Sequence, residues 1–326
     1  MTNKPKFSKN ILVIDDIESF VNQICQKLKN DIGSVLRRKG GVIGISGGID
    51  SSVTLALAVK TLGAENIKAL MLPERDSSPD SLLLAKTLAE KFNVKYTVEN
   101  ISGALDGLNC YQRRDEAVKR VFPEYNATEY KVKIGISPNS LNQNLPPLFL
   151  ATIVDSNGTE KSARLPLEEY LQIVAASNFK QRVRMSMLYY YAEKHHYAVI
   201  GTPNKHEVEQ GFFVKHGDGA ADVMPIAGLY KTQVYQLAKF LGVPQEIIER
   251  TPTTDTYSAE QTQEEFFFQM PFQEMDLLWY AFENNYSYED VGEVMNITPA
   301  EVGRIFNGFN RKIKTTEYLR MSPIRH

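Results

Sequence analysis

The chain has 326 residues, of which 43% are hydrophobic and 23% are charged, a balance typical of a globular protein with a substantial core. Its net charge of −2 argues against a general nucleic-acid-binding protein, and no stretch approaches the ~20 apolar residues that a membrane span needs. Cys25 and Cys110 are too few for a disulfide framework or a structural zinc site, and the first residues lack a secretory-signal pattern, so the expected location is cytoplasmic.

The first third of the chain alternates between helix and strand patterns. Apolar residues spaced three or four apart predict a helix over 16–38, and a β-branched run predicts a strand over 41–46. The elements expected next are a helix over 50–62 with an Asp/Ser cap, a strand over 67–73, a helix over 78–92 and a strand over 94–101. Buried strands that alternate with helices predict an α/β fold with a doubly wound parallel sheet.

Residues 123–166 break this alternation. Apolar runs at 130–136 and 147–154, and a polar run at 160–165 after an Asp-Ser-Asn-Gly turn, indicate a β-rich insertion at the edge of the sheet. The elements expected after it are a long helix over 167–195, a strand over 197–202, a helix over 228–242 and two or three helices within 276–313. We therefore expect a main domain over 1–275 and a helical C-terminal extension over 276–326.

The segment SGGIDSS lies between the first predicted strand and the helix that follows it. Its two glycines let the backbone turn tightly and present amides to an anion, and the start of the helix adds its positive end. Its serine hydroxyls can donate to phosphate oxygens, and its aspartate can hold a magnesium ion. The segment matches neither GxxxxGK[ST] nor GxGxxG. The candidate ATP-binding residues here are Ser46, Gly47, Gly48, Asp50, Ser51 and Ser52.

SGGIDSS resembles the pyrophosphate loop of the N-type ATP pyrophosphatases, in which an acid attacks the α-phosphate of ATP and pyrophosphate leaves. A second stretch over 201–231, GTPNKHEVEQGFFVKHGDGAADVMPIAGLYK, is similar to a segment of the ammonia-dependent NAD synthetases. The run NFKQRVRM over 178–185 resembles a helical motif of the same family. The resemblance spans about 17–325 and is greatest to the longer form of the family, which has a middle insertion and a helical extension.

This resemblance implies an adenine nucleotide hydrolase-like fold and a Mg²⁺ cofactor, with Glu207 as a second magnesium-binding carboxylate beside Asp50. It also implies that Thr202, Thr253 and Lys231 contact ATP, and that Asp218 or Asp222 binds or deprotonates ammonium. The catalytic residues it implies are Asp50, Lys215, Asp218, Asp222 and Lys231. The residues it implies for binding the acid substrate are Arg182, Arg184, Lys215 and Asp222.

The implied reaction joins ammonia to nicotinic acid adenine dinucleotide. The carboxylate attacks the α-phosphate of ATP to give an acyl-adenylate and pyrophosphate, and ammonia then releases AMP and NAD. About 40 residues precede the loop, so we expect free ammonia or a separate glutaminase as the nitrogen source. The resemblance also implies a homodimer, to which the stripe of the 16–38 helix contributes unless it covers the chain's own sheet. The loop over 205–225 is expected to be mobile and to close over substrate.

Two departures from the family pattern leave the acid substrate open. Tyr318-Leu319-Arg320 stands where the family often has His-Lys-Arg, and Gln263-Glu264 stands where short members have an Asp-Glu pair. One alternative is therefore an amide ligase of the same fold that acts on another carboxylic acid. A second is a DNA-binding protein, because residues 286–312 have the look of a helix–turn–helix. That segment carries as many acids as bases, which favours packing over DNA contact.

Overall fold

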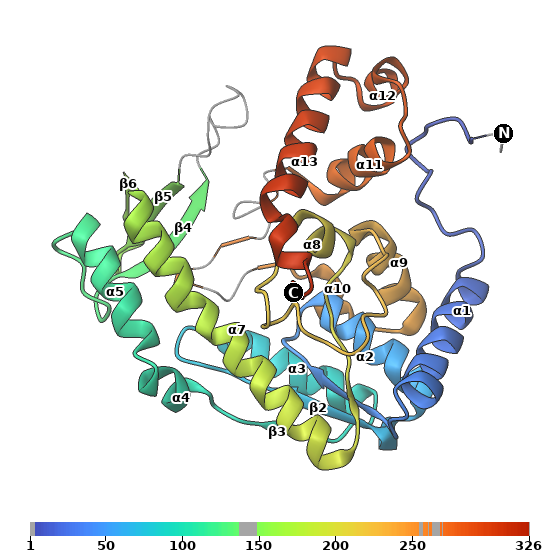
Figure 1. Ribbon diagram of the computed structural model, residues 1–326, viewed down its shortest axis with the longest axis horizontal. Coiled ribbons are helices and arrows are strands. Elements are labelled where there is room, and N and C mark those ends of the chain that lie inside the picture. Colours follow the sequence, from blue (N-terminus) through green and yellow to red (C-terminus); the bar gives the residue numbers. More distant parts are fainter. Residues whose placement is uncertain are drawn as a thin grey trace.

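The computed structural model describes residues 4–136, 149–253, 257–259, 261–262, 268 and 270–325. A four-stranded parallel sheet in the order β3-β2-β1-β7 lies at its centre (Figure 1). Its strands are β1 (Gly41–Gly44), β2 (Ile67–Met71), β3 (Tyr96–Val98) and β7 (Ala198–Val199). The predicted parallel sheet is confirmed. The Gln263-Glu264 pair lies outside the described residues.

Helices cover both faces of this sheet, because successive strand residues point to opposite sides. Ile43 faces one core and its neighbour Val42 faces the other. The first face packs against α1 (Ile17–Asn30), α2 (Ile49–Leu62), α3 (Pro79–Lys91) and α9 (Lys231–Leu241). The second face packs against α4 (Ser102–Gly107), α5 (Cys110–Val121) and α7 (Leu167–His195). Short turns η1 (Asp31–Val35), η2 (Ala64–Asn66), α8 (Lys205–Gln210) and α10 (Gln245–Glu249) complete this part of the fold.

The apolar stripe of the first helix is partly buried. Leu28 of α1 and Ile32 of η1 lie in the core that α1 shares with α2 and the sheet, whereas Val35 is 67% exposed. Part of the stripe therefore covers the chain's own core, and its part in a dimer stays a prediction.

The insertion forms a sheet of its own. Strands β4 (Lys131–Ile136), β5 (Phe149–Val154) and β6 (Glu160–Arg164) pair antiparallel in that order, with no hydrogen-bonded pairing to the central sheet among the described residues. The predicted β-rich insertion is confirmed, and it forms a sheet separate from the central one. Val132 and Ile153 share a core with Val118 of α5 and Ile173 of α7. The insertion packs there because α7 is 29 residues long and carries its own apolar surface out to it.

Helices α4 and α5 are elements that the sequence pattern did not predict. Asn109 adopts a left-handed φ of 52° between them, which breaks the periodicity. Charged residues are also frequent over 112–120, yet Arg114 in the middle of that run is only 3% exposed. This charged run is thus partly buried.

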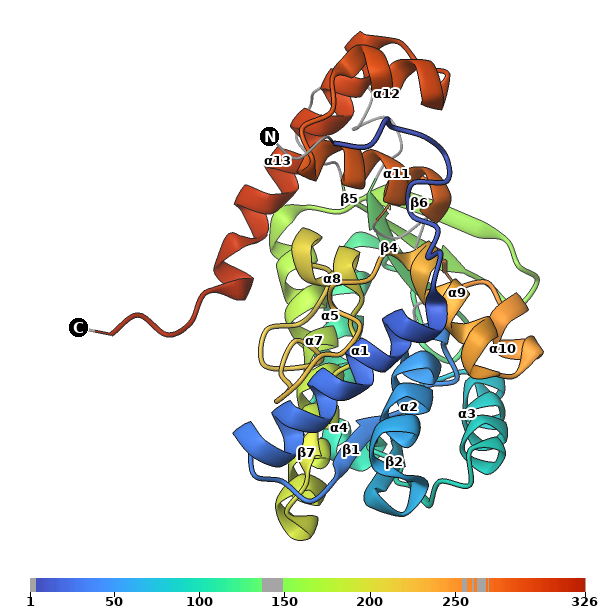
Figure 2. The ribbon, with the colours of Figure 1, turned by 90° about the vertical axis from the view of Figure 1, so that its right-hand side faces the viewer.

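The C-terminal helices α11 (Phe272–Glu283), α12 (Tyr288–Met295) and α13 (Pro299–Arg320) surround a separate core centred on Trp279. Phe7 and Leu12 from the start of the chain join this core, and the first segment runs beside these helices (Figure 2). The division at residue 275 stays a prediction, since both ends of the chain build one core. Within the described residues, every helix is too short or too polar to cross a bilayer.

Candidate active site

The loop after β1 turns through glycines at the start of α2. Gly47 has a φ of +74°, and a Cβ added there would lie 2.7 Å from the backbone oxygen of Ser81. The cap of α2 is Gly48, not Asp50, so the predicted Asp/Ser cap was wrong. The hydroxyls of Ser51 and Ser52 instead donate to the Gly48 carbonyl at 2.9 and 2.8 Å. The Asp50 side chain is directed elsewhere, toward Lys231 and Asn204.

Replacing Gly47 by alanine is expected to remove ATP binding. Alanine strains a left-handed φ by about 1 kcal/mol, and its methyl group would push the loop away from α3. The thermal shift produced by ATP would report this loss. Gly158→Ala is a matched control, because Gly158 has a φ of +81° with nothing within 4 Å of its Cβ position. Gly158→Ala should lower the unfolding temperature slightly and keep the thermal shift that ATP produces. A wild-type thermal shift in Gly47→Ala would refute the prediction.

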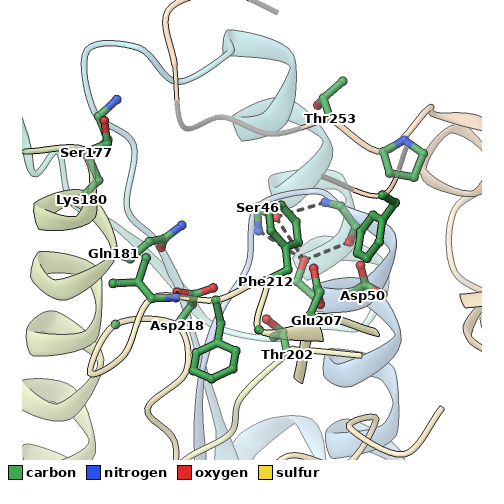
Figure 3. Close-up of a pocket in the computed structure, with 18 of the residues that line it drawn as sticks. Ser46, Asp50, Ser177, Lys180, Gln181, Thr202, Glu207, Phe212, Asp218 and Thr253 are labelled. Atoms are coloured by element: carbon green, nitrogen blue, oxygen red, sulfur yellow. Dashed lines mark hydrogen bonds between the residues drawn. The ribbon is translucent and has the colours of Figure 1, made fainter. Parts of the chain in front are cut away.

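Asp50 and Glu207 lie beside this loop (Figure 3), and Lys231 forms a charged group with them. The Lys231 ammonium, whose side chain is fully buried, lies 2.5 Å from Asp50 Oδ2. Burial first, and the charge of Asp50 second, raise the pKa of Glu207 to about 8, although Lys231 acts in the opposite direction. The charge of Asp50 therefore disfavours the ionised form of Glu207, and the Lys231 ammonium favours it.

Asn204 is a contributor that the sequence analysis missed. Its side chain caps α8 by accepting from the Glu207 N–H at 3.2 Å, and its own N–H donates to Glu207 Oε2 at 2.9 Å. Its amide also donates to Asp50 Oδ1 at 3.3 Å. It therefore fixes both carboxylates relative to each other. The signal was readable, because an Asn three residues before a Glu is the pattern of a capping box.

A cavity of about 1030 Å³ opens over these groups. It follows α7 from Tyr170 to Leu188, which is about 27 Å at 1.5 Å per residue. Helix α7, the insertion, the segment over 201–220 and helix α13 contribute to its wall. The candidate residues that line it are Ser46, Gly47, Gly48, Asp50, Ser51, Arg184, Thr202, Glu207, Asp218 and Thr253.

Five other candidates lie off the wall of this cavity. Ser52 and Lys231 are buried behind the loop. Asp222 accepts the Val199 N–H at 2.8 Å and so fastens its segment to β7. Lys215 donates to the Tyr318 and Met321 carbonyls, and Arg182 Nε donates to the Lys215 carbonyl at 3.3 Å. The roles expected for Arg182, Lys215 and Asp222 therefore stay predictions.

Asp218 occupies a different part of the wall from the two metal-site candidates (Figure 3). Burial raises its pKa to about 6, although the N–H groups of Val214 and Gly219 and the charge of Arg184 oppose this rise. The Val214 N–H donates to Asp218 Oδ1 at 2.8 Å. The pKa of this carboxylate is therefore raised well above that of an ordinary aspartate.

Helix α13 supplies cavity residues that the sequence analysis did not assign. Arg304, Arg311 and Lys312 line the wall, and burial lowers the pKa of Lys312 to about 8. In the Tyr-Leu-Arg segment that departs from the family, Arg320 donates to the Val208 carbonyl of α8 at 3.3 Å. The helix–turn–helix look of 286–312 thus corresponds to helices whose apolar sides share the C-terminal core and whose second helix faces the cavity.

Asp50 and Glu207 fit a magnesium ion. Mg²⁺ in nucleotide sites is usually held by one or two carboxylates together with substrate phosphates. Among the described residues no cluster of three or more His, Cys, Asp or Glu side chains could hold a metal ion. The remaining ligands would therefore have to come from ATP and water, which is the arrangement expected beside a phosphate-binding loop.

A family model described as NAD synthase matches residues 20–132 and 151–323. The NH(3)-dependent NAD(+) synthetase of Rhizobium meliloti (strain 1021) is 46% identical over 98% of this chain and 95% of that protein. The chain belongs to the NAD synthase family. Residues 133–150, between the two matched stretches, lie in the insertion.

Two solved structures show a likeness over almost the whole chain. NMN synthetase from Francisella tularensis is 25% identical, with a TM-score of 0.62, over 94% of this chain and 98% of that one. NH3-dependent NAD synthetase from Campylobacter jejuni is 22% identical, with a TM-score of 0.62, over 96% of this chain and all of that one. At 22% identity, the similarity to the Campylobacter jejuni structure supports the fold alone. The predicted family and fold class are both confirmed.

Proposed function

We propose that this chain makes NAD from nicotinic acid adenine dinucleotide, ammonia and ATP. A carboxylate oxygen of the acid bonds to the α-phosphorus of ATP, and the bond from that phosphorus to the bridging oxygen breaks, releasing pyrophosphate. The nitrogen of ammonia then bonds to the activated carbonyl carbon and loses a proton. The bond from that carbon to AMP breaks, which releases AMP and NAD.

The loop and the charged group beside it would perform the first step. Backbone N–H groups of Gly47 and Gly48 and the N-terminus of α2 hold phosphate oxygens. Asp50 and Glu207 would hold Mg²⁺, which neutralises phosphate charge when bound. Lys231 holds Asp50 in place at 2.5 Å, and its charge also opposes the negative charge that develops on the leaving pyrophosphate. Thr202 and Thr253 line the cavity, and we infer that their hydroxyls donate to ATP.

Arg184 and Asp218 would act on the acid and on ammonia. Arg184 lines the cavity on α7 and offers a planar cation to the carboxylate or to a phosphate of the acid. Asp218 would hold ammonium and accept its proton. Lys215, Arg182 and Asp222 would join the site when the loop over 205–225 closes, which requires Lys215 to leave the carbonyls at the end of α13.

The observation that carries this proposal is the meeting of SGGIDSS, Glu207 and Asp218 around one cavity in a chain of this family. A shorter acid, nicotinic acid mononucleotide, is the second candidate, because a relative at 25% identity is described as an NMN synthetase. The extent of the cavity, about 27 Å along α7 from Tyr170 to Leu188, favours the dinucleotide.

The deciding experiment measures pyrophosphate release from Mg²⁺-ATP with ammonium and either acid. Release with the dinucleotide that matches NAD formation supports the proposal, and preference for the mononucleotide transfers it to the second candidate. Release with neither acid would refute both candidate functions.

We also propose Mg²⁺ as the metal and a homodimer as the assembly. Replacement of the metal would test the first proposal, and light scattering would test the second. Free ammonia is the proposed nitrogen source, to be compared with glutamine.

The rate at saturating ammonium is expected to fall as the pH drops below about 6. The raised pKa of Asp218 means that it gains a proton there, and a neutral carboxyl group holds ammonium poorly. Asp218→Asn should be slower and lack this inflection. The ionisation of ammonia itself affects both proteins equally, so the difference between their pH profiles isolates Asp218. An inflection near pH 6 that persists in the variant would assign it to another group.

A further inference from the structure

Asp276 of α11 is a fully buried carboxylate on which three elements converge. Its Oδ1 lies 2.6 Å from His206 Nε2, whose side chain is also fully buried. Its Oδ2 accepts the Thr232 N–H at 2.7 Å, and its Oδ1 accepts the Lys231 N–H at 3.3 Å. Asp276 therefore satisfies the first two backbone donors of α9 while it binds a side chain of α8.

The proton positions in this cluster follow from its neighbours. Lys312 of α13 donates to Gln210 Oε1 at 3.3 Å, and an ammonium group can only donate. The Gln210 amide nitrogen therefore faces His206 Nδ1, at 3.1 Å, and donates to it. His206 Nδ1 is then an acceptor, so its proton is on Nε2 and points to Asp276. Hydrogen bonds thus connect the cavity wall to the start of α9, and they meet at Asp276, which accepts from His206 and from the N–H groups of Lys231 and Thr232.

The first turns of α8 and α9, which these hydrogen bonds connect, carry two of the three charged residues of the site, Glu207 and Lys231. Lys231 is the first residue of α9, and its ammonium reaches Asp50. Glu207 follows His206 directly in α8. The His206 ring has little freedom to move, because it contacts the rings of Tyr230, Phe268 and Trp279 edge-on, with centroids 5.8 to 6.0 Å apart.

We infer that His206 and Asp276 are positioning residues for the adenylation step, through which the C-terminal helices set the places of Lys231 and Glu207. The adenylation step in this inference rests on the proposed function, whereas the contacts of His206 and Asp276 are observed in the structure. A shift of about 1 Å in a positioned group can lower a rate about 100-fold. The C-terminal extension would then be part of the catalytic apparatus as well as a cover over the cavity.

The test compares kcat and KM for pyrophosphate release in Asp276→Asn and His206→Gln. Asp276→Asn keeps the shape but loses an acceptor, so we expect kcat to fall by about 30- to 100-fold, with KM for the acid within about threefold. His206→Gln keeps a donor near the Nε2 position and should retain kcat within about fivefold. Tyr286→Phe is the matched control, because it removes the buried hydrogen bond to the Pro5 carbonyl in the same core.

A purely structural role would give a different pattern. Asp276→Asn would then lower thermal stability as Tyr286→Phe does and keep the wild-type kcat, which would overturn the inference. If Asp276→Asn does not fold, Gln210→Met breaks the same chain without changing charge; a kcat reduced about tenfold supports the inference, and a wild-type kcat overturns it.

A binding measurement separates this inference from the proposed function. The affinity for Mg²⁺-ATP, measured by calorimetry, needs no acid substrate and no turnover. Weaker binding in Asp276→Asn than in Tyr286→Phe supports the inference even if no NAD is formed by the wild-type protein. Equal binding in the two variants counts against it, whichever acid proves to be the substrate.

Discussion

Asp50→Asn is expected to slow pyrophosphate release at least about 1000-fold while the protein still folds. Removal of one preorganised charge from such a site commonly costs a factor of about 10²–10³, and Asp50 both holds Lys231 and is a proposed metal ligand. Steady-state release from Mg²⁺-ATP with the dinucleotide acid measures the effect. Asp155→Asn, in the exposed turn between β5 and β6, should leave the rate within about twofold.

The same substitution leaves Lys231 buried beside Glu207 alone. Loss of one partner of a buried ion pair costs about 3–5 kcal/mol of unfolding free energy, and the remaining attraction of Glu207 should reduce that loss. A double variant that adds Lys231→Met should therefore regain stability but not activity. Recovery of both would show that the charges of Asp50 and Lys231 matter for folding only.

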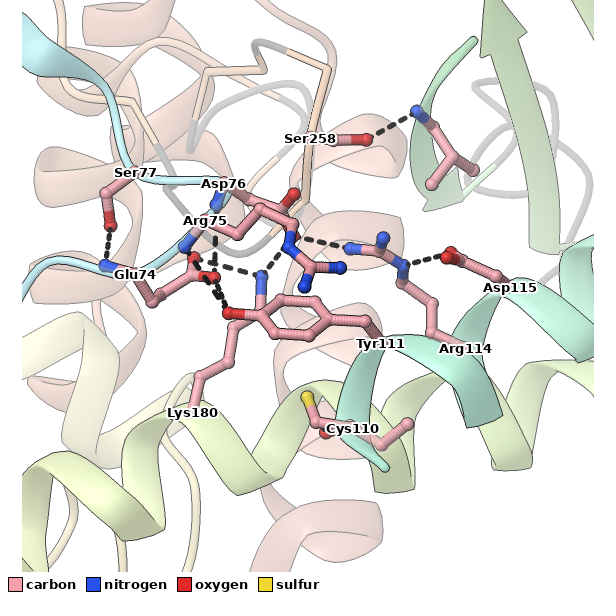
Figure 4. A network of polar contacts seen from close by, with 12 residues as sticks. Glu74, Arg75, Asp76, Ser77, Cys110, Tyr111, Arg114, Asp115, Lys180 and Ser258 are labelled. Atoms are coloured by element: carbon pink, nitrogen blue, oxygen red, sulfur yellow. Dashed lines mark hydrogen bonds and ion pairs between the residues drawn. The ribbon is translucent and has the colours of Figure 1, made fainter. Parts of the chain in front are cut away.

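Lys180→Met is expected to lower the free energy of unfolding by about 3–5 kcal/mol. Lys180 is 1% exposed and lies between two carboxylates at the end of β2, 3.1 Å from Glu74 Oε1 and 2.7 Å from Asp76 Oδ2 (Figure 4). Arg114 of α5 reaches Asp76 at 2.5 Å, so the group joins α5 and α7 to the loop after β2.

Urea unfolding would measure this loss. Lys161→Met is a suitable control, because its ion pair with Glu124 is exposed at both ends and should change stability by less than about 1 kcal/mol. Similar losses in the two variants would mean that the buried group contributes no more than a surface pair. Lys180 also lines the cavity, so the variant should be assayed for ATP binding at a temperature at which it is folded.

Low pH should weaken the ion pairs that Asp76 forms with Lys180 and Arg114. Burial acts to raise the pKa of Asp76, but the charges of Lys180 and Arg114 outweigh it and hold the pKa below its usual range. A lowered pKa contributes stability above the unfolded value of about 3.9, and that stability is lost as the pH falls through the folded value. Unfolding free energies of wild type and Asp76→Asn should therefore converge below about pH 4. A constant difference between them down to pH 2 would contradict this.

The sequence alone located the elements that local chemistry specifies. The ends of α7 agree with the predicted range 167–195, and SGGIDSS begins after β1 and runs into the first turn of α2. The antiparallel strands of the insertion were also predicted, because alternation and an Asx turn are patterns within a few residues. The family followed from two motifs, and the match over 20–132 and 151–323 confirms it.

Other features depended on residues that are distant in the sequence. The charged run over 112–120 gave no sign that Arg114 would be buried, since its partner Asp76 is 38 residues away. The position of α13 on the cavity wall could not be predicted, because its amphipathic pattern shows which side is apolar but not what faces the other side.

The sequence by itself determined the family, the phosphate-binding loop and most of the helices and strands, since these depend on backbone preferences and on spacing within one element. Only the tertiary structure decided which charges meet. Lys231 reaches Asp50 across 181 residues, and Asp276 reaches His206 across 70. A buried charge is stable only beside a partner that replaces its hydration, and that partner is chosen by how the helices pack on the sheet.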